Sequence, residues 1–364
     1  MKYTSYISLL SIILGVLLAI QISCSKDEET PPISPTVELS QLPYDKLSDY
    51  NFFEGNLADQ KPIEGVLPYD LNTPLFSNYS AKARFIWMPE GSVNTYNEDD
   101  ILDFPIGTVI IKTFYYDNDF NDPLAGKRLL ETRLLIRQDT AWQSASYIWN
   151  EAQTEADFSV VGKQVEVTWK HYDGSTRSTL YLIPNKNECK GCHNSDNITH
   201  PIGPKIRNLN KDFPYTDGTM NQLQKWKEMG YLKDFPDNAP NVAVWNDPIT
   251  GTLNERARAY IDVNCAHCHN PKSPANTTGL FLNYHETDPT RLGICKEPVA
   301  AGQGSGGFAY GIVPGDADNS IMTYRMGSIE PDVAMPELLR SVVDVEGVQL
   351  LRDWINAMPE DDCN

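Results

Sequence analysis

The chain has 364 residues, of which 41% are hydrophobic, and its formal net charge is −19 at pH 7. This length is sufficient for two or three globular domains, and the apolar content is normal for a folded protein. The strongly acidic balance excludes nucleic acid and a bare anionic lipid surface as binding partners, because both repel an acidic protein, whereas a basic protein partner would suit it.

The first residues of the chain have the pattern of an export signal. A basic start precedes the apolar stretch of residues 7–20, which is too short to span a membrane comfortably. Ser23 and Cys24 follow, and a small residue directly before a cysteine resembles the lipobox at which signal peptidase II cuts. We therefore predict lipidation at Cys24 and anchoring to a Gram-negative membrane: the outer membrane, the cell surface or the periplasmic side. The alternative is an ordinary secretory signal with an unmodified cysteine.

Residues 47–185 have the pattern of an antiparallel sheet or sandwich. Residues 108–116 are a run of β-branched and aromatic side chains, and residues 163–170 alternate apolar with polar. An Asp-Gly pair at 173–174 separates this second run from residues 178–183, which is typical of a hairpin turn. The many aromatic residues of this region are interpreted as core, and an exposed aromatic row that binds a glycan is the alternative.

Two pentapeptides, residues 189–193 and 265–269, have the pattern C-x-x-C-H, the attachment signature of c-type haem. The two thiols of each motif would bond the haem vinyl groups as thioethers, and the histidine would be an axial ligand of the iron. These positions share one face of a helical turn, so all three side chains can reach one porphyrin. We predict two covalently bound haem c groups, attached through Cys189, Cys192, His193, Cys265, Cys268 and His269. The alternative is a zinc site, although zinc does not require a histidine directly after each cysteine pair.

Two further cysteines remain once Cys24 and the motifs are accounted for. Cys295 and Cys363 are predicted to form a disulfide, because an exported protein meets an oxidising environment. Closing a loop of this length would stabilise the fold by up to ~4 kcal/mol and tie the C-terminus to the second motif region. Two free thiols are the alternative.

From residue 187 onward the chain resembles class I cytochromes c. In that family a Gly-Pro pair follows the motif helix and its carbonyl orients the haem-ligating histidine, and residues 203–204 match this pair. The resemblance implies that the Pro204 carbonyl accepts a hydrogen bond from His193. It also implies a methionine ligand before the last helix of the first module. That ligand is predicted to be Met220, with Met229 and His200 as alternatives.

The second module carries more of the same resemblance. Residues 254–264 are predicted to be a helix that runs into the motif, and a final helix is predicted to be N-capped by Asp344. Between them Met335 precedes a proline, which in the family is the context of the sixth iron ligand. The resemblance implies Met335 as that ligand and Arg325 as a contact of a haem propionate. Met322 and Met326 are the competing methionines.

The predicted fold class is an α+β multidomain protein, in which an N-terminal antiparallel β-rich domain precedes two all-α haem modules similar to cytochrome c. The expected boundaries are 1–23 for the signal peptide, 24–46 for an extended tether, 47–185 for the β-rich domain, and 186–245 and 246–364 for the two modules. The chain order therefore places the sheet before both haem motifs.

The function that these features predict is electron transfer outside the cytoplasm. The protein would pass electrons between a respiratory or dehydrogenase partner and another redox carrier, and one partner is expected to be basic. Histidine–methionine ligation fills both axial positions of the iron, so an electron carrier is expected rather than a catalyst. The alternatives are a di-haem peroxidase, which needs a displaceable sixth ligand, and a surface lipoprotein that binds a glycan or protein through its β-rich domain.

Overall fold

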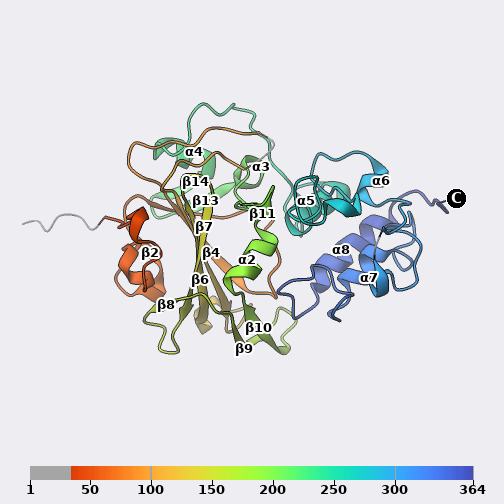
Figure 1. Ribbon diagram of the computed structural model, residues 1–364, viewed down its shortest axis with the longest axis horizontal. Helices are drawn as coiled ribbons and strands as arrows, with labels where there is room; N and C mark the ends of the chain where they lie inside the picture. Colours follow the sequence, from red (N-terminus) through yellow and green to blue (C-terminus); the bar gives the residue numbers. More distant parts are fainter. Residues whose placement is uncertain (1–33, 99–100, 300, 364) are drawn as a thin grey trace, which may run out of the picture. The chain divides into compact units, whose positions relative to one another are not determined.

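The structure is a computed structural model that describes residues 34–98, 101–299 and 301–363 (Figure 1). The predicted signal peptide, the lipidation site Cys24 and the first part of the tether lie outside the described residues. No described helix combines the length and the hydropathy that are needed to cross a membrane.

A six-stranded antiparallel sheet forms the centre of the N-terminal half. Its strands follow one another in space in the same order as in the sequence. They are β3 (Val66–Tyr69), β4 (Ala81–Trp87), β5 (Val109–Asp117), β6 (Lys127–Arg137), β7 (Trp142–Trp149) and β8 (Ala156–Ser159). A separate hairpin, β9 (Lys163–Lys170) and β10 (Thr176–Ile183), has the predicted Asp-Gly pair in its turn, and β1 (Phe53–Glu54) pairs with β2 (Lys61–Pro62).

The two faces of this sheet differ in character. Alternate side chains of a strand point to opposite faces, so Val109 and Ile111 of β5 pack in one apolar cluster while Ile110 packs in another. Further along the second face, Phe114 packs with Trp169 from the β9–β10 hairpin. The second face thus has an apolar cluster at each end, and between them it carries Lys112, a charged residue at the centre of the sheet.

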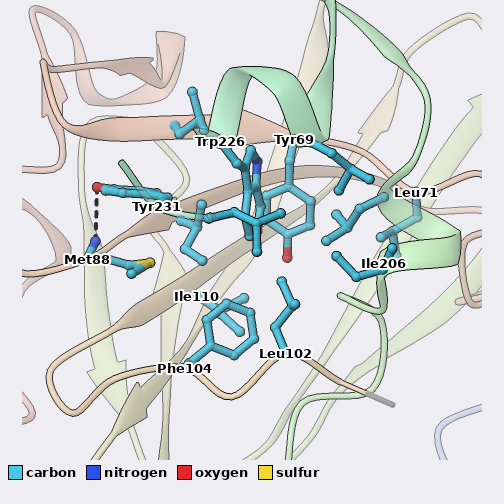
Figure 2. Close-up of a cluster of buried hydrophobic side chains, with 14 of the residues drawn as sticks. Tyr69, Leu71, Met88, Leu102, Phe104, Ile110, Ile206, Trp226 and Tyr231 are labelled. Atoms are coloured by element: carbon cyan, nitrogen blue, oxygen red, sulfur yellow. Dashed lines mark hydrogen bonds between the residues drawn. The ribbon is translucent and has the colours of Figure 1, made fainter. Parts of the chain in front are cut away.

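Residues 186–245 do not form the predicted all-α module. Their helices are α2 (Lys186–Cys192), α3 (Ile206–Leu209) and α4 (Gln222–Glu228), and their strands are β11 (Asn194–Ser195), β12 (Ile198–Thr199), β13 (Asp212–Tyr215) and β14 (Gly218–Asn221). Such short helices cannot bury a core of their own. Figure 2 shows Ile206 of α3 and Trp226 of α4 in one cluster with Ile110 of the sheet. This region is therefore part of the sheet domain.

The C-terminal region also departs from the predicted class. Its helices are α5 (Leu253–Asn264), α6 (Pro289–Leu292), α7 (Ile321–Met326) and α8 (Val345–Asn356), joined by long irregular segments. Ile261 of α5 packs with Leu351 and Trp354 of α8 in its core. The described chain as a whole is rich in β-structure and has few helices, most of them short. The prediction of two all-α modules of the class I cytochrome c type is therefore wrong.

Hydrogen bonds connect the sheet region to the C-terminal region. The side chain of Asn78, in the loop between β3 and β4, donates to the Leu339 carbonyl at 2.8 Å and accepts from the Ser341 amide at 2.9 Å. The hydroxyl of the neighbouring Tyr79 donates to Glu346 of α8 at 2.6 Å. The segment that follows Met335 is thus held against the sheet.

Candidate functional site

The first motif lies on the short helix α2, which packs against β7 (Figure 1). The helix begins where the side chain of Asn185 accepts from the amides of residues 187 and 188, at 2.8 and 3.0 Å. It ends as the His193 amide donates to the Cys189 carbonyl at 3.1 Å. Cys189, Cys192 and His193 therefore occupy one continuous turn, with Cys189 buried and the other two half-buried.

The ring of His193 is held by a backbone acceptor. Its Nδ1–H donates to the His200 carbonyl at 2.7 Å, and the His200 amide donates back to the His193 carbonyl at 2.9 Å. The acceptor is thus His200 rather than the expected Pro204, because the β11–β12 hairpin returns the chain to the ring at residue 200. Burial, followed by the nearby Lys112 ammonium, lowers the pKa of His193 to about 3, so the imidazole is neutral and its Nε2 is the atom left for a metal.

An open cleft separates this motif from the sheet. Cys189, His193 and Pro204 line one side of it. The space between the protein atoms of the cleft, including the open solvent at its mouth, is about 610 Å³. The residues that line the sheet side include Tyr69, Arg84, Ile110, Lys112, Arg133, Ser144 and Ser146.

Three cations on the sheet side of the cleft form a row across neighbouring strands. In the register of the sheet, Arg84 of β4 is directly opposite Lys112 of β5, which is directly opposite Arg133 of β6. This row could not be predicted from the sequence, because the three residues lie in separate strands and meet only through the register. Ser146 of β7 is opposite Arg133 and extends the row toward Cys189.

The second motif lies at the end of α5. Thr252 caps this helix, and the turn continues through the motif as the amides of Cys268 and His269 donate to the Cys265 carbonyl at 3.1 and 2.9 Å. His269 Nδ1 lies 3.3 Å from the hydroxyl of Thr278. That hydroxyl donates to the Ala275 carbonyl, so the ring nitrogen donates to it and Nε2 is again left for a metal.

The two histidines of this motif have similar ring environments. Burial, and then the Arg325 guanidinium, lowers the pKa of His269 to about 4, which keeps the ring neutral. His267 has its Nδ1 3.2 Å from the Val263 carbonyl, a contact within its own helix end. Burial also lowers the pKa of His267 to about 4, so both rings are neutral, and what sets His269 apart is its position directly after the second thiol.

The other residues expected near the second motif lie around a loop after α7. The Met335 amide donates to the Arg325 carbonyl at 3.1 Å, and Arg325 Nε donates to the Val333 carbonyl at 2.8 Å. Arg325 thus shapes the loop that carries Met335 and is also close enough to lower the pKa of His269. The competing methionines, Met322 and Met326, pack in the core between α5 and α8.

The structure does not bring a methionine to the first cleft. Met220 lies on β14 opposite Phe213 and packs against the cluster that contains Trp226. Met229 is exposed at the end of α4. None of the described residues that line the cleft is a methionine, and the lining contains no histidine other than His193.

The two motifs lie next to each other, which the sequence alone did not indicate. The Asp196 amide, just after the first motif, donates to the carbonyl of Lys272, just after the second, at 2.8 Å. A Cβ atom at Gly191, inside the first motif, would come within 2.6 Å of Leu338 in the loop after Met335. Position 191 is thus covered by the loop after Met335, and Glu337 of the same loop acts on Cys268 of the second motif.

The motif cysteines are also consistent with the two motifs being close together. Burial, and then the neighbouring Cys192, raises the pKa of Cys268 to about 12. Burial likewise raises the pKa of Cys265 to about 12. Zinc is bound by thiolates, and within the described residues the motif sulfurs do not gather into a group of three or more metal-ligand atoms. This arrangement disfavours the zinc alternative.

The last two cysteines are joined: Cys295 and Cys363 form a disulfide. The bond attaches the end of the chain to the loop after α6, and the hydroxyl of Tyr310 donates to the Cys363 carbonyl at 2.9 Å. The C-terminus is therefore fixed to the region of the second motif.

Comparison with known proteins finds no matching family model, no similar curated protein and no similar solved structure. The resemblance to class I cytochromes c therefore has no support from a matching protein, and the fold contradicts it. The function is therefore inferred from the two pentapeptides and from the residues that surround them in this fold.

Proposed function

We propose that the protein carries two covalently attached haem c groups and transfers electrons outside the cytoplasm, between a respiratory or dehydrogenase partner and another redox carrier. The observation that carries this proposal is the adjacency of the two C-x-x-C-H turns. The Asp196–Lys272 hydrogen bond joins the segments that follow them, and Cys192 is close enough to Cys268 to affect its pKa. Electron transfer falls steeply with distance, so neighbouring attachment sites favour a relay.

The residues of both sites suit a haem. Each motif has its thiols and histidine on one helical turn, and each histidine uses Nδ1 for a hydrogen bond and has Nε2 left for iron. Haem iron, when bound, supplies a centre that accepts and releases one electron. The chain's own part is to hold each imidazole in one tautomer and orientation, through His200 for the first and Thr278 for the second.

The surroundings of the second site favour a carrier rather than a catalyst. Met335 lies in the loop that Arg325 holds, and Arg325 acts on the ring of His269, so a thioether is available in the same neighbourhood. We propose Met335 as the sixth ligand there. Histidine–methionine ligation leaves no open position for a substrate.

The charge and the predicted export signal complete the proposal. With a net charge of −19, the protein is suited to a basic redox partner. Lipidation at Cys24 would keep it on the outer membrane, at the cell surface or facing the periplasm. Covalent attachment of haem is an advantage there, because a dissociated haem would be lost.

A peroxidase-type haem enzyme is the second candidate, and one observation favours it. The first cleft is open, and its described lining offers no methionine and no second histidine as a sixth ligand. An iron with a vacant or displaceable position could react with peroxide. A glycan-binding role has less support, since Trp142, Trp149 and Trp169 are all buried.

The test begins with the purified exported protein. We expect two haem c per chain in a pyridine haemochrome assay, one in a Cys265→Ser/Cys268→Ser variant, and two in the matched control Cys295→Ser/Cys363→Ser. A wild-type protein without haem, or with zinc in its place, would end the proposal. Electron paramagnetic resonance then separates the candidates: two low-spin irons without peroxide turnover support the carrier, and a high-spin iron with turnover supports the enzyme.

A further inference from the structure

We propose that Arg84, Lys112 and Arg133 form a carboxylate-binding site for the propionate groups of the haem attached at Cys189 and Cys192. This inference rests on the proposed haem attachment and extends it, because it makes the β-sheet one wall of the first haem pocket. The sequence resemblance had implied a propionate contact only for Arg325, in the other half of the chain.

The three cations of the row repel one another. Residues directly opposite each other in neighbouring antiparallel strands have Cβ atoms about 4.5–5.5 Å apart, and like charges in these positions destabilise a sheet. Arg84, Lys112 and Arg133 occupy three successive positions of this kind. A row of three cations in the middle of a sheet face therefore requires anions close by.

The carboxylates of the protein are too few to pair with all three cations. Arg84 pairs with Asp70 at 2.6 Å, and Arg133 pairs with the buried Glu131 at 2.5 Å. The ammonium of Lys112, between them, has no hydrogen-bond or ion-pair partner among the described residues and lies 5.3 Å from the centre of the Phe114 ring. Three cations thus face two carboxylates.

The electrostatics of Lys112 agree with this deficit. Burial, and then Arg133 and Arg84, lowers the pKa of Lys112 to about 7. A lysine in this state is penalised for its charge, and a carboxylate ligand would remove the penalty. The two arginines keep their charge in any case, so the row stays cationic.

The row of cations lies beside the first motif. Arg84, Lys112 and Arg133 line the same cleft as Cys189 and His193. Lys112 is close enough to lower the pKa of His193, and Arg133 and Lys112 both act on Cys189. A carboxylate-bearing group attached to this motif therefore enters the cleft that the cations line.

The whole-chain charge favours an attached carboxylate over a free anion. A protein with a net charge of −19 repels small anions from its surroundings. A porphyrin bonded to Cys189 and Cys192 brings its two propionates into the cleft at a high effective concentration. Free oxyanions share the same chemistry, and the experiment distinguishes the two sources.

The experiment measures reduction potentials on the haem-loaded protein. In a Cys265→Ser/Cys268→Ser background, which keeps only the first haem, we compare Lys112→Met with Lys127→Met, an exposed lysine at the start of β6. Loss of a cation beside the propionates stabilises the ferric iron, so Lys112→Met should lower the potential. It should also make the potential depend on pH across the neutral range, because the propionates then titrate there. Lys127→Met should change neither, and Lys112→Arg should restore both.

Three other outcomes would overturn this inference, the proposed function or both. An unchanged potential and pH profile in Lys112→Met would overturn the inference while the haem content still supports the proposed function. Binding of sodium phosphate to the wild-type protein, lost in Lys112→Met, would assign the row to free oxyanions and also overturn it. Should Lys112→Met fail to accumulate with haem, Arg84→Gln carries the same test, with the same downward shift expected. A wild-type chain without haem would end both proposals together.

Discussion

The two C-x-x-C-H turns have the same chemistry but are supported in different ways. The second lies at the end of the long helix α5, which packs on α8, so its support comes from helices on either side of it in the C-terminal region. The first lies on the seven-residue helix α2, and the wall opposite it is a sheet that ends many residues earlier in the chain. The second motif is surrounded by helices, whereas the residues that face the first motif are brought together by the register of a sheet.

If both motifs carry the proposed haem groups, the charges around each motif will affect the reduction potential of its haem. The cleft of the first motif is lined by three cations, two of which are paired with carboxylates, whereas at the second motif Arg325 acts on His269 and Glu337 acts on Cys268. Positive charge near haem favours the reduced iron. We therefore expect the first centre to have the more electropositive surroundings, which gives a relay of two neighbouring centres a direction.

The largest expected effect comes from separating the sheet from the residues after it. A chain truncated after Pro184 would lose Ile206, Leu209 and Trp226, which fill the apolar cluster on the second face of the sheet (Figure 2). Loss of a large core side chain costs about 2–5 kcal/mol, so the combined loss is comparable to the whole stability of an ordinary domain. We expect no cooperative unfolding transition for residues 34–184.

The measurement is thermal unfolding followed by near-ultraviolet circular dichroism. A truncation after residue 245 is the matched control, because it keeps the whole cluster and should retain a cooperative transition if the sheet domain ends there. A cooperative transition in the shorter chain would show that the sheet is independent of the first motif, and the comparison between the two motifs would then lose its basis.

Elements that depend only on residues close together in the chain were predicted correctly. The helix over residues 254–264 and the capping of α8 by Asp344 were both predicted, and the structure has α5 at Leu253–Asn264 and an Asp344 carboxylate that accepts the Gly347 amide at 2.9 Å. Each depends on a pattern within one helix: an apolar stripe or a capping side chain.

Features that depend on contacts between residues far apart in the chain were not predicted. The contribution of α3 and α4 to the core of the sheet domain cannot be inferred from their own residues, because an apolar face does not reveal what covers it. The family resemblance supplied a wrong answer, an all-α module. The same limit applies to Lys112, since its opposite neighbours Arg84 and Arg133 are set by strand register.

An intermediate effect is expected from the ion pair beside the first motif. Glu131 is fully buried, binds Arg133 through both carboxylate oxygens, and accepts from the Tyr181 hydroxyl at 2.8 Å. Glu131→Ala would leave a mostly buried guanidinium without its partner, which costs about 3–5 kcal/mol of unfolding free energy. Urea denaturation measures this loss.

Two further variants serve as comparisons for Glu131→Ala. Glu131→Gln keeps the hydrogen-bond acceptor but not the charge, so it should cost less than Glu131→Ala. Glu166→Ala, at an exposed position of β9, should stay within about 0.5 kcal/mol of the wild type. If Glu131→Ala were as harmless as Glu166→Ala, the cationic row would not depend on this carboxylate.

The smallest effect is expected in the helix pair of the second region, at Asp344. Its carboxylate caps α8 through the Gly347 amide and accepts from the buried Tyr260 hydroxyl of α5 at 2.6 Å. Asp344→Ala removes both bonds and should cost about 1–2 kcal/mol, the usual loss for an N-cap. Asp344→Asn retains both contacts, with its amide nitrogen donating to the tyrosine oxygen, and should cost less.

The pH dependence of Asp344 separates its charge from its hydrogen bonds. Burial raises the pKa of Asp344, so the folded protein holds a proton that the unfolded chain has already lost once the pH passes the ordinary aspartate value. The folded state binds more protons in that window, and the contribution of this group to stability therefore falls as pH rises from about 4 to the raised folded value. Above that value the penalty is constant. The difference in unfolding free energy between wild type and Asp344→Asn should shift in favour of Asn over this window, and a difference that is flat with pH would mean that the carboxylate is not penalised by burial.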